Sequence, residues 1–195
     1  MARTSAKRSV WTALRGGALA MAGLIIVSAA ACGGGEAKPT ASGVGGTSPA
    51  WMNKGSGPAA SERGRAFFGV GVSEGAKGQA LRRKEADGKA RAELANVVVA
   101  YTAKLAKSYA ATSGDAAQQQ AVGDALRAIA QKQLAAVRIV DHWVSKEGNE
   151  SSLSMLDLET YKASIDKAGT LGAEIRDAVK AAADKAFDDP DEPKS

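Results

Sequence analysis

The chain has 195 residues, and 26 lysines and arginines against 21 aspartates and glutamates give it a formal net charge of +5. Its single cysteine excludes a disulfide framework and any cysteine-rich metal site. The basic excess lies in residues 1–31, which contain no acid and four basic residues: Arg3, Lys7, Arg8 and Arg15. The remaining 22 basic and 21 acidic residues are almost balanced, so we expect no nucleic-acid binding.

Residues 1–31 have the three-part pattern of a secretory signal peptide. A polar, basic stretch (1–15) precedes a small, apolar stretch (16–27), and the small residues 28–31 follow. The apolar stretch is too short for a membrane-spanning helix, which needs about 20 apolar residues. The pattern therefore predicts a segment that directs export and is then removed.

The only cysteine lies directly after this segment. Ala29-Ala30-Ala31-Cys32 resembles the bacterial lipobox, although Ala29 stands where that motif usually has leucine. The resemblance implies cleavage between Ala31 and Cys32 and attachment of fatty acids such as palmitate to Cys32. Each buried CH₂ contributes about 0.8 kcal/mol, and a single acyl chain binds a membrane only marginally. Stable anchoring therefore needs two or more chains. The alternative is an ordinary signal peptide cut near Ala31, which would leave a free thiol.

Composition divides the rest of the chain into three parts. Residues 32–50 are rich in glycine, serine, threonine and proline, and predict a flexible tether after the lipidated cysteine. Residues 51–186 carry enough apolar residues for one folded domain. Residues 187–195 are acidic and predict a disordered tail.

The first half of the domain predicts a strand and two helices. Residues 65–73 combine aromatic residues with valines that alternate with glycines, which is typical of a strand. Apolar residues then recur every three or four positions over 77–110 and again over 115–136, which indicates two helices. Asp115, after the Ser113-Gly114 break, predicts the N-cap of the second helix.

The second half predicts a hairpin and a long helix. Residues 137–145 are β-branched and aromatic, 146–149 predict a turn, and 152–158 predict a second strand. One apolar stripe runs through 159–186, which indicates a single C-terminal helix. The element order predicts an α+β fold, with a small antiparallel sheet, helices on one face and the long C-terminal helix packed on it.

Several of these segments match one family. Ser48-Pro49-Ala50-Trp51, Phe68-Gly69-Val70-Gly71 and the run Ala86-Asp87-Gly88-Lys89-Ala90-Arg91-Ala92-Glu93-Leu94-Ala95 resemble the LPP-twenty-type bacterial lipoproteins. Ile139-Val140-Asp141-His142-Trp143 and Leu156-Asp157-Leu158 look like the later hairpin of one branch. The resemblance covers about residues 48–165. It implies an envelope lipoprotein without enzymatic activity, whose relatives include flagellum-associated outer-membrane lipoproteins and surface antigens.

Two motifs suggest chemistry that their context disfavours. The Gly69-Val70-Gly71 start of a nucleotide-binding loop has Glu74 where the third glycine belongs, so we expect close packing of a helix instead. His142 is the only histidine, and its neighbour Asp141 must point to the opposite face of a strand. Ser145 also faces away from His142, so we predict a structural or surface histidine and no catalytic residues.

The remaining candidates are aromatic and basic. Trp51 and Trp143 could line a ligand groove, but core packing is the more frequent role of such residues. The cluster Arg82-Arg83-Lys84 could contact anionic headgroups or peptidoglycan, but the acids around it favour a solvated helix face. The sequence predicts no metal site and no cofactor.

These observations favour a lipid-anchored protein of the cell envelope, with Cys32 as the attachment site. Gly33 after the cysteine favours the outer membrane, by resemblance to known sorting rules. The domain would then be a structural or interaction module that contacts other envelope proteins or itself. The alternatives are a ligand-binding module with a groove between sheet and helix, and an accessory protein of a flagellar or envelope assembly.

Overall fold

A computed structural model describes residues 40–61, 64–75 and 78–189. The five strands of one sheet are β1 (Thr40–Val44), β2 (Gly57–Ser61), β3 (Gly64–Ser73), β4 (Arg138–Val144) and β5 (Glu150–Asp157). Their order is β1-β4-β5-β3-β2. Neighbours from β4 to β2 are antiparallel, and β1 pairs in parallel with β4 at the edge. The predicted α+β fold with an antiparallel sheet is confirmed, with one parallel strand added to it.

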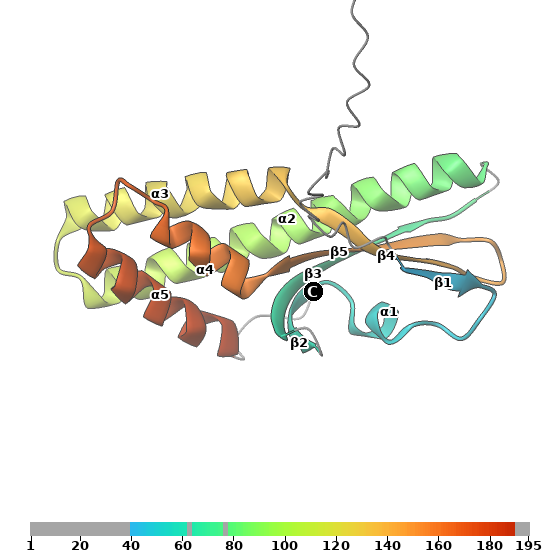
Figure 1. Ribbon diagram of the computed structural model, residues 1–195, viewed down its shortest axis with the longest axis horizontal. Helices are drawn as coiled ribbons and strands as arrows, with labels where there is room; N and C mark the ends of the chain where they lie inside the picture. Colours follow the sequence, from blue (N-terminus) through green and yellow to red (C-terminus); the bar gives the residue numbers. More distant parts are fainter. Residues whose placement is uncertain (1–39, 62–63, 76–77, 190–195) are drawn as a thin grey trace, which may run out of the picture. The chain divides into compact units, whose positions relative to one another are not determined.

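Four of the helices described pack on one face of this sheet or beyond its end, as Figure 1 shows. They are α2 (Gln79–Thr112), α3 (Ala116–Ala135), α4 (Leu158–Asp166) and α5 (Ala173–Asp188). The short helix α1 (Ala50–Lys54) lies on the other face, where Trp51 Nε1 donates a hydrogen bond to Asp141 of β4. Asp115 caps α3 as predicted, because its side chain accepts from the amides of Ala117 and Gln118.

Glycines in β3 allow α2 to approach the sheet closely. A Cβ atom at Gly69 would overlap the backbone of Ala90 and Leu94, and one at Gly71 would overlap the backbone of Ala86 and Ala90. The expected role of these glycines is therefore confirmed, since the helix backbone occupies the space that a side chain would need.

The hydrophobic core lies where the second half of α2 meets β3, β5 and the last two helices. Four buried aromatic residues stack edge to face or tilted here: Phe67, Tyr101, Tyr161 and Phe187. The ring centroids of Phe67 and Tyr101 are 4.6 Å apart. The Tyr101 hydroxyl donates to the carbonyl of Ala183, so this polar group is also satisfied.

Residues near the N-terminal boundary differ from the prediction. The segment 32–50, predicted as a tether, contains β1, which pairs with β4 from Thr40↔Asp141 to Val44↔Val144. Its glycines and serines have low β propensity, so the sequence pattern does not indicate a strand. Backbone hydrogen bonds to the edge of the sheet stabilise β1 instead. The sequence also gives no signal for β2, which contains Pro58 and forms the other edge of the sheet.

The C-terminal helix also differs from the prediction. Residues 159–186 form α4 and α5, separated by a turn in which Leu171 is buried and Gly172 is the N-cap of α5. The turn folds α5 back, so that Val179, Ala183 and Phe187 join the core. The predicted tail 187–195 is wrong at its start, since α5 ends at Asp188 and Phe187 is buried.

Candidate functional site

The predicted cleavage and lipidation residues, Ala31 and Cys32, lie outside the described residues. The predicted signal peptide, most of the predicted tether and residues 190–195 lie outside them as well. The candidate sites below therefore belong to the folded domain alone.

The one histidine belongs to a polar cluster between sheet and helix. Asp87 of α2 accepts from the Ser152 hydroxyl on β5 at 2.6 Å, and its Oδ1 lies 2.8 Å from His142 Nε2 on β4. His142 and Ser152 are directly opposite each other in the β4–β5 ladder. The prediction of a structural or surface histidine therefore fits this geometry in its first form, but no local pattern indicated that Asp87 would be its partner.

This cluster has the residue types of a catalytic triad in an arrangement that does not activate the serine. In a triad, histidine lies between the serine and the acid and takes the proton from the hydroxyl. Here the carboxylate of Asp87 lies between Ser152 and His142, and the hydroxyl already donates to it. We conclude that the three side chains join α2 to the hairpin.

A buried carboxylate lies at the hairpin end of the sheet. The side chain of Glu150 is fully buried, and its Oε1 accepts a charge-assisted hydrogen bond of 2.8 Å from Arg83 Nε. Removing one partner of such a pair leaves a buried charge uncompensated. Arg83 is 44% exposed, which agrees with the predicted solvated helix face, and its guanidinium in addition pairs with this acid from the sheet.

Asp141 and Ser145 face away from His142, as predicted, and each has a structural role. The carboxylate of Asp141 accepts from Trp51 Nε1 at 2.9 Å and from the backbone amide of His142 at 2.8 Å. The Ser145 hydroxyl accepts from the amides of Glu147 and Asn149 and so closes the hairpin turn. Trp51 and Trp143 are both half-buried, on the sheet face that α1 partly covers.

An ion-pair network surrounds the aromatic core. Asp184 of α5 accepts from Lys162 and from Arg65, and the Arg65 guanidinium lies 5.7 Å from the centre of the Phe187 ring. Burial raises the pKa of Asp184, but the hydrogen bonds from Lys162 and Arg65 outweigh burial, so its pKa lies below the ordinary carboxyl value. Burial likewise raises the pKa of the Tyr101 hydroxyl, which keeps it protonated.

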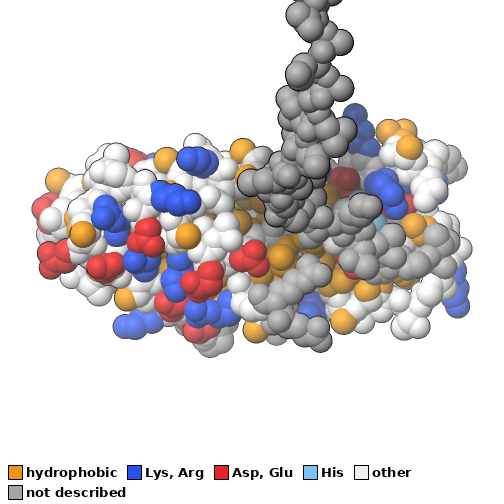
Figure 2. All heavy atoms as spheres, in the orientation of Figure 1, with side chains coloured by type: hydrophobic (Ala, Val, Ile, Leu, Met, Phe, Trp, Pro, Cys, Tyr) orange, Lys and Arg blue, Asp and Glu red, His pale blue; other side chains and the backbone are white. Residues whose placement is uncertain are grey.

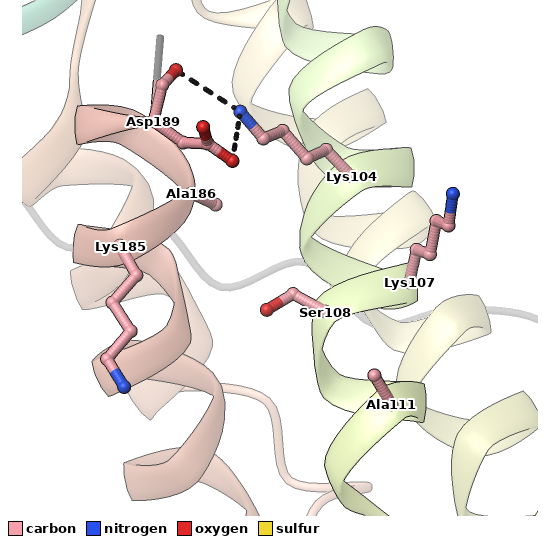
Figure 3. A pocket seen from close by; sticks show the side chains of 7 residues that line it. All are labelled: Lys104, Lys107, Ser108, Ala111, Lys185, Ala186 and Asp189. Carbon is pink, nitrogen blue, oxygen red and sulfur yellow. Dashed lines mark hydrogen bonds and ion pairs between the residues drawn. The ribbon is translucent and has the colours of Figure 1, made fainter. Parts of the chain in front are cut away.

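A groove of about 350 Å³ lies between α2 and α5 (Figure 3). Three lysines, two alanines, a serine and an aspartate line it: Lys104, Lys107, Ser108, Ala111, Lys185, Ala186 and Asp189. Lys104 bonds to Asp189 across the groove, whereas Lys107 and Lys185 point away from it on opposite sides. The ligand-binding alternative called for an apolar pocket between sheet and helix, whereas this groove lies between two helices.

The described residues contain no group of three or more histidine, cysteine or acidic side chains that could hold a metal ion. Within the same part of the chain, no helix combines the length and the apolar character needed to cross a bilayer. Comparisons with protein-family models, with curated proteins and with solved structures found no match. The likeness to LPP-twenty-type lipoproteins therefore stays a prediction.

Proposed function

We propose that this protein is a lipid-anchored lipoprotein of the bacterial cell envelope, with its domain acting as a structural or interaction module. The observation that carries the proposal is the sequence Ala29-Ala30-Ala31-Cys32 directly after a basic and an apolar stretch. Gly33 favours the outer membrane as its destination. In this proposal the partner that the domain contacts determines the process that the protein serves, and a flagellar assembly is one candidate.

The contacts of the domain support a role without catalysis. The side chains best suited to acid–base or nucleophilic chemistry are His142, Asp87 and Ser152, and their mutual hydrogen bonds hold α2 on the sheet. The Arg83–Glu150 pair does the same one turn earlier in the helix. The domain therefore acts through its surface in this proposal, while the anchor sets its location.

Labelling with a radioactive fatty acid tests the anchor. Bacteria that express the full chain are grown with labelled palmitate, and the protein is purified and counted. We expect label in the native chain and in a Gly34→Ala control, and none in a Cys32→Ser variant. A Cys32→Ser chain that still takes up label, or a native chain without label, would overturn the proposal.

A further inference from the structure

The sheet has one face that none of the four longer helices of the described chain covers, and we call it the open face. Neighbours in the ladder share a face, so Phe68 and Met155 form one row on it, Val70 and Leu153 the next, and Val72 lies beyond them. Trp143 lies in the last row, opposite Ser151. Apart from Leu153, these apolar residues are half-buried. Hydrophobic side chains accordingly gather over the sheet in Figure 2, and charged ones over α4 and α5.

Charges on the open face are few and compatible with an interface. Asp141 lies in the same row as Val70, but its carboxylate is satisfied by Trp51 Nε1 and the His142 amide. Asp157 lies at the end where α4 begins. Arg138, opposite Met155, is exposed, as is Lys54 at the end of α1. The face thus presents aromatic and aliphatic residues beside two cationic side chains and two carboxylates, of which that of Asp141 is already hydrogen-bonded, and its aromatic and aliphatic part suits the headgroup region of a phospholipid bilayer.

The stretch of chain between the anchor and the sheet is short. Because β1 begins at Thr40, seven residues separate Cys32 from the sheet, not the eighteen of the predicted tether. Eight residue steps span at most about 26–29 Å. A linker of this length gives an effective concentration in the millimolar range, so even a weak affinity for the bilayer would keep the domain on it.

We propose that the open face lies against the phospholipid surface to which Cys32 is attached, with Trp51 and Trp143 at the level of the headgroups. The inference rests on the proposed lipid anchor. It gives the domain a defined orientation, in which α2 and α3 face away from the membrane and are the elements that a partner can reach.

The tryptophans provide the test. The chain has three, and Trp11 lies in the segment that the proposed cleavage removes, so the processed protein would keep only the two of the open face. The lipidated protein is purified from cells that express the full chain. It is then reconstituted into phosphatidylcholine–phosphatidylglycerol vesicles with and without bromine on the acyl chains. Bromine quenches tryptophan only at short range, so we expect a loss of fluorescence in the brominated vesicles for the native protein, Trp51→Phe and Trp143→Phe.

A reporter on the opposite side is the matched control. Val99 of α2 is 58% exposed, and Val99→Trp in the Trp51→Phe/Trp143→Phe background places one tryptophan away from the open face. We expect this reporter to fluoresce equally in both kinds of vesicle. The orientation would be overturned if Trp51 and Trp143 fluoresced equally in brominated and unbrominated vesicles. It would also be overturned if bromine quenched the Val99 reporter as strongly as it quenches the tryptophans of the open face.

The failure of the anchor is measured separately from the failure of the orientation. The mass of the N-terminal peptide shows whether the purified protein carries acyl chains. Protein without them overturns both proposals. In the other outcome, the protein is acylated while bromine in the vesicles leaves its open-face tryptophans unquenched. If iodide in the water does not quench them either, another protein surface covers the open face. That result would overturn the orientation alone.

Discussion

The two halves of α2 contact the sheet in different ways. The first half lies on glycines and serines, with Ala86 and Ala90 against Gly69 and Gly71, and with Asp87 bonded to His142 and Ser152. The second half presents Val98, Tyr101 and Leu105 to an aromatic core. Backbones approach closely in the first half, whereas large side chains fill the space in the second.

This difference separates two tasks in the fold. Burial of aromatic and aliphatic side chains supplies most of the stabilising free energy, and it is non-directional. The hydrogen bonds of the Asp87 cluster are directional and hold one position of the helix along the strands. Ser154 adds to them, because its hydroxyl bonds to the carbonyls of both Gly69 and Ala90. We therefore infer that the aromatic half stabilises the domain and the small-residue half sets the register of α2.

The largest effect is expected from Phe67→Ala in the aromatic half. Phe67 is fully buried and contacts three other aromatic rings, so its loss leaves a cavity. We expect the free energy of unfolding to fall by about 3–5 kcal/mol, measured by urea denaturation followed by circular dichroism.

The neighbouring residue is the control for this substitution. Phe68 lies on the open face and is half-buried, so Phe68→Ala removes the same atoms with less burial lost. In the absence of membranes, we expect a clearly smaller loss than for Phe67→Ala. Equal losses would mean that the core extends through both faces of the sheet, contrary to the comparison above.

Gly69→Ala tests the small-residue half by overpacking. The added methyl group would overlap backbone atoms of Ala90 and Leu94, which cannot rotate away as a flexible side chain could. We expect a loss of about 3 kcal/mol, at the upper end of overpacking effects, in the same denaturation measurement.

Gly88→Ala is the matched control on the helix itself. Nothing lies within 4 Å of a Cβ atom at Gly88, so alanine there should only improve helix propensity. We expect a gain of about 0.5–1 kcal/mol. If Gly69→Ala and Gly88→Ala changed the free energy of unfolding equally, the close approach of the helix backbone would not be the reason for glycine at position 69.

Asp87→Ala removes the acceptor of the polar cluster. It leaves His142 and Ser152 without their shared partner in a mostly buried position, and such unsatisfied groups cost about 1–3 kcal/mol. Glu93→Ala, at an exposed position of the same helix, should change the free energy of unfolding by less than about 0.5 kcal/mol. A double-mutant cycle of Asp87→Ala with Ser152→Ala should show coupling, and additive effects would contradict a shared cluster.

The predictability of the fold follows the same division. Periodic apolar residues predicted α2 and α3, and β-branched and aromatic residues beside a turn predicted the hairpin, because large side chains leave a pattern in the sequence. The glycines of β3 also indicated close helix packing. By contrast, β1 and β2 are edge strands of small residues, and backbone pairing with β4 and β3 stabilises them without such a pattern. The apolar stripe of 159–186 continues across the turn after α4, so periodicity alone missed the break.

The polar contacts were less predictable than the helices and strands. His142 was predicted by elimination to be a structural or surface residue, but its partner Asp87 lies 55 residues away on another element. Nothing in the local sequence links Arg83 to Glu150, or Trp51 to Asp141. Such pairs depend on strand order and register, which local patterns do not determine.

The smallest effect is expected at the charged rim of the aromatic half. The pKa of Asp184 is lowered in the folded protein, so its contribution to stability is present above the ordinary carboxyl pKa and is lost as the pH falls through the folded value. Because its side chain is 39% exposed, screening limits that contribution to about 0.2–1 kcal/mol. We expect Asp184→Asn to lower the urea midpoint slightly at neutral pH, and the difference from the native chain to vanish on acidification. Asp124→Asn, which affects only an exposed pair with Arg127, should shift the midpoint less. A difference at Asp184 that persisted unchanged at acid pH would show that packing against α4, and not charge, is what this residue contributes.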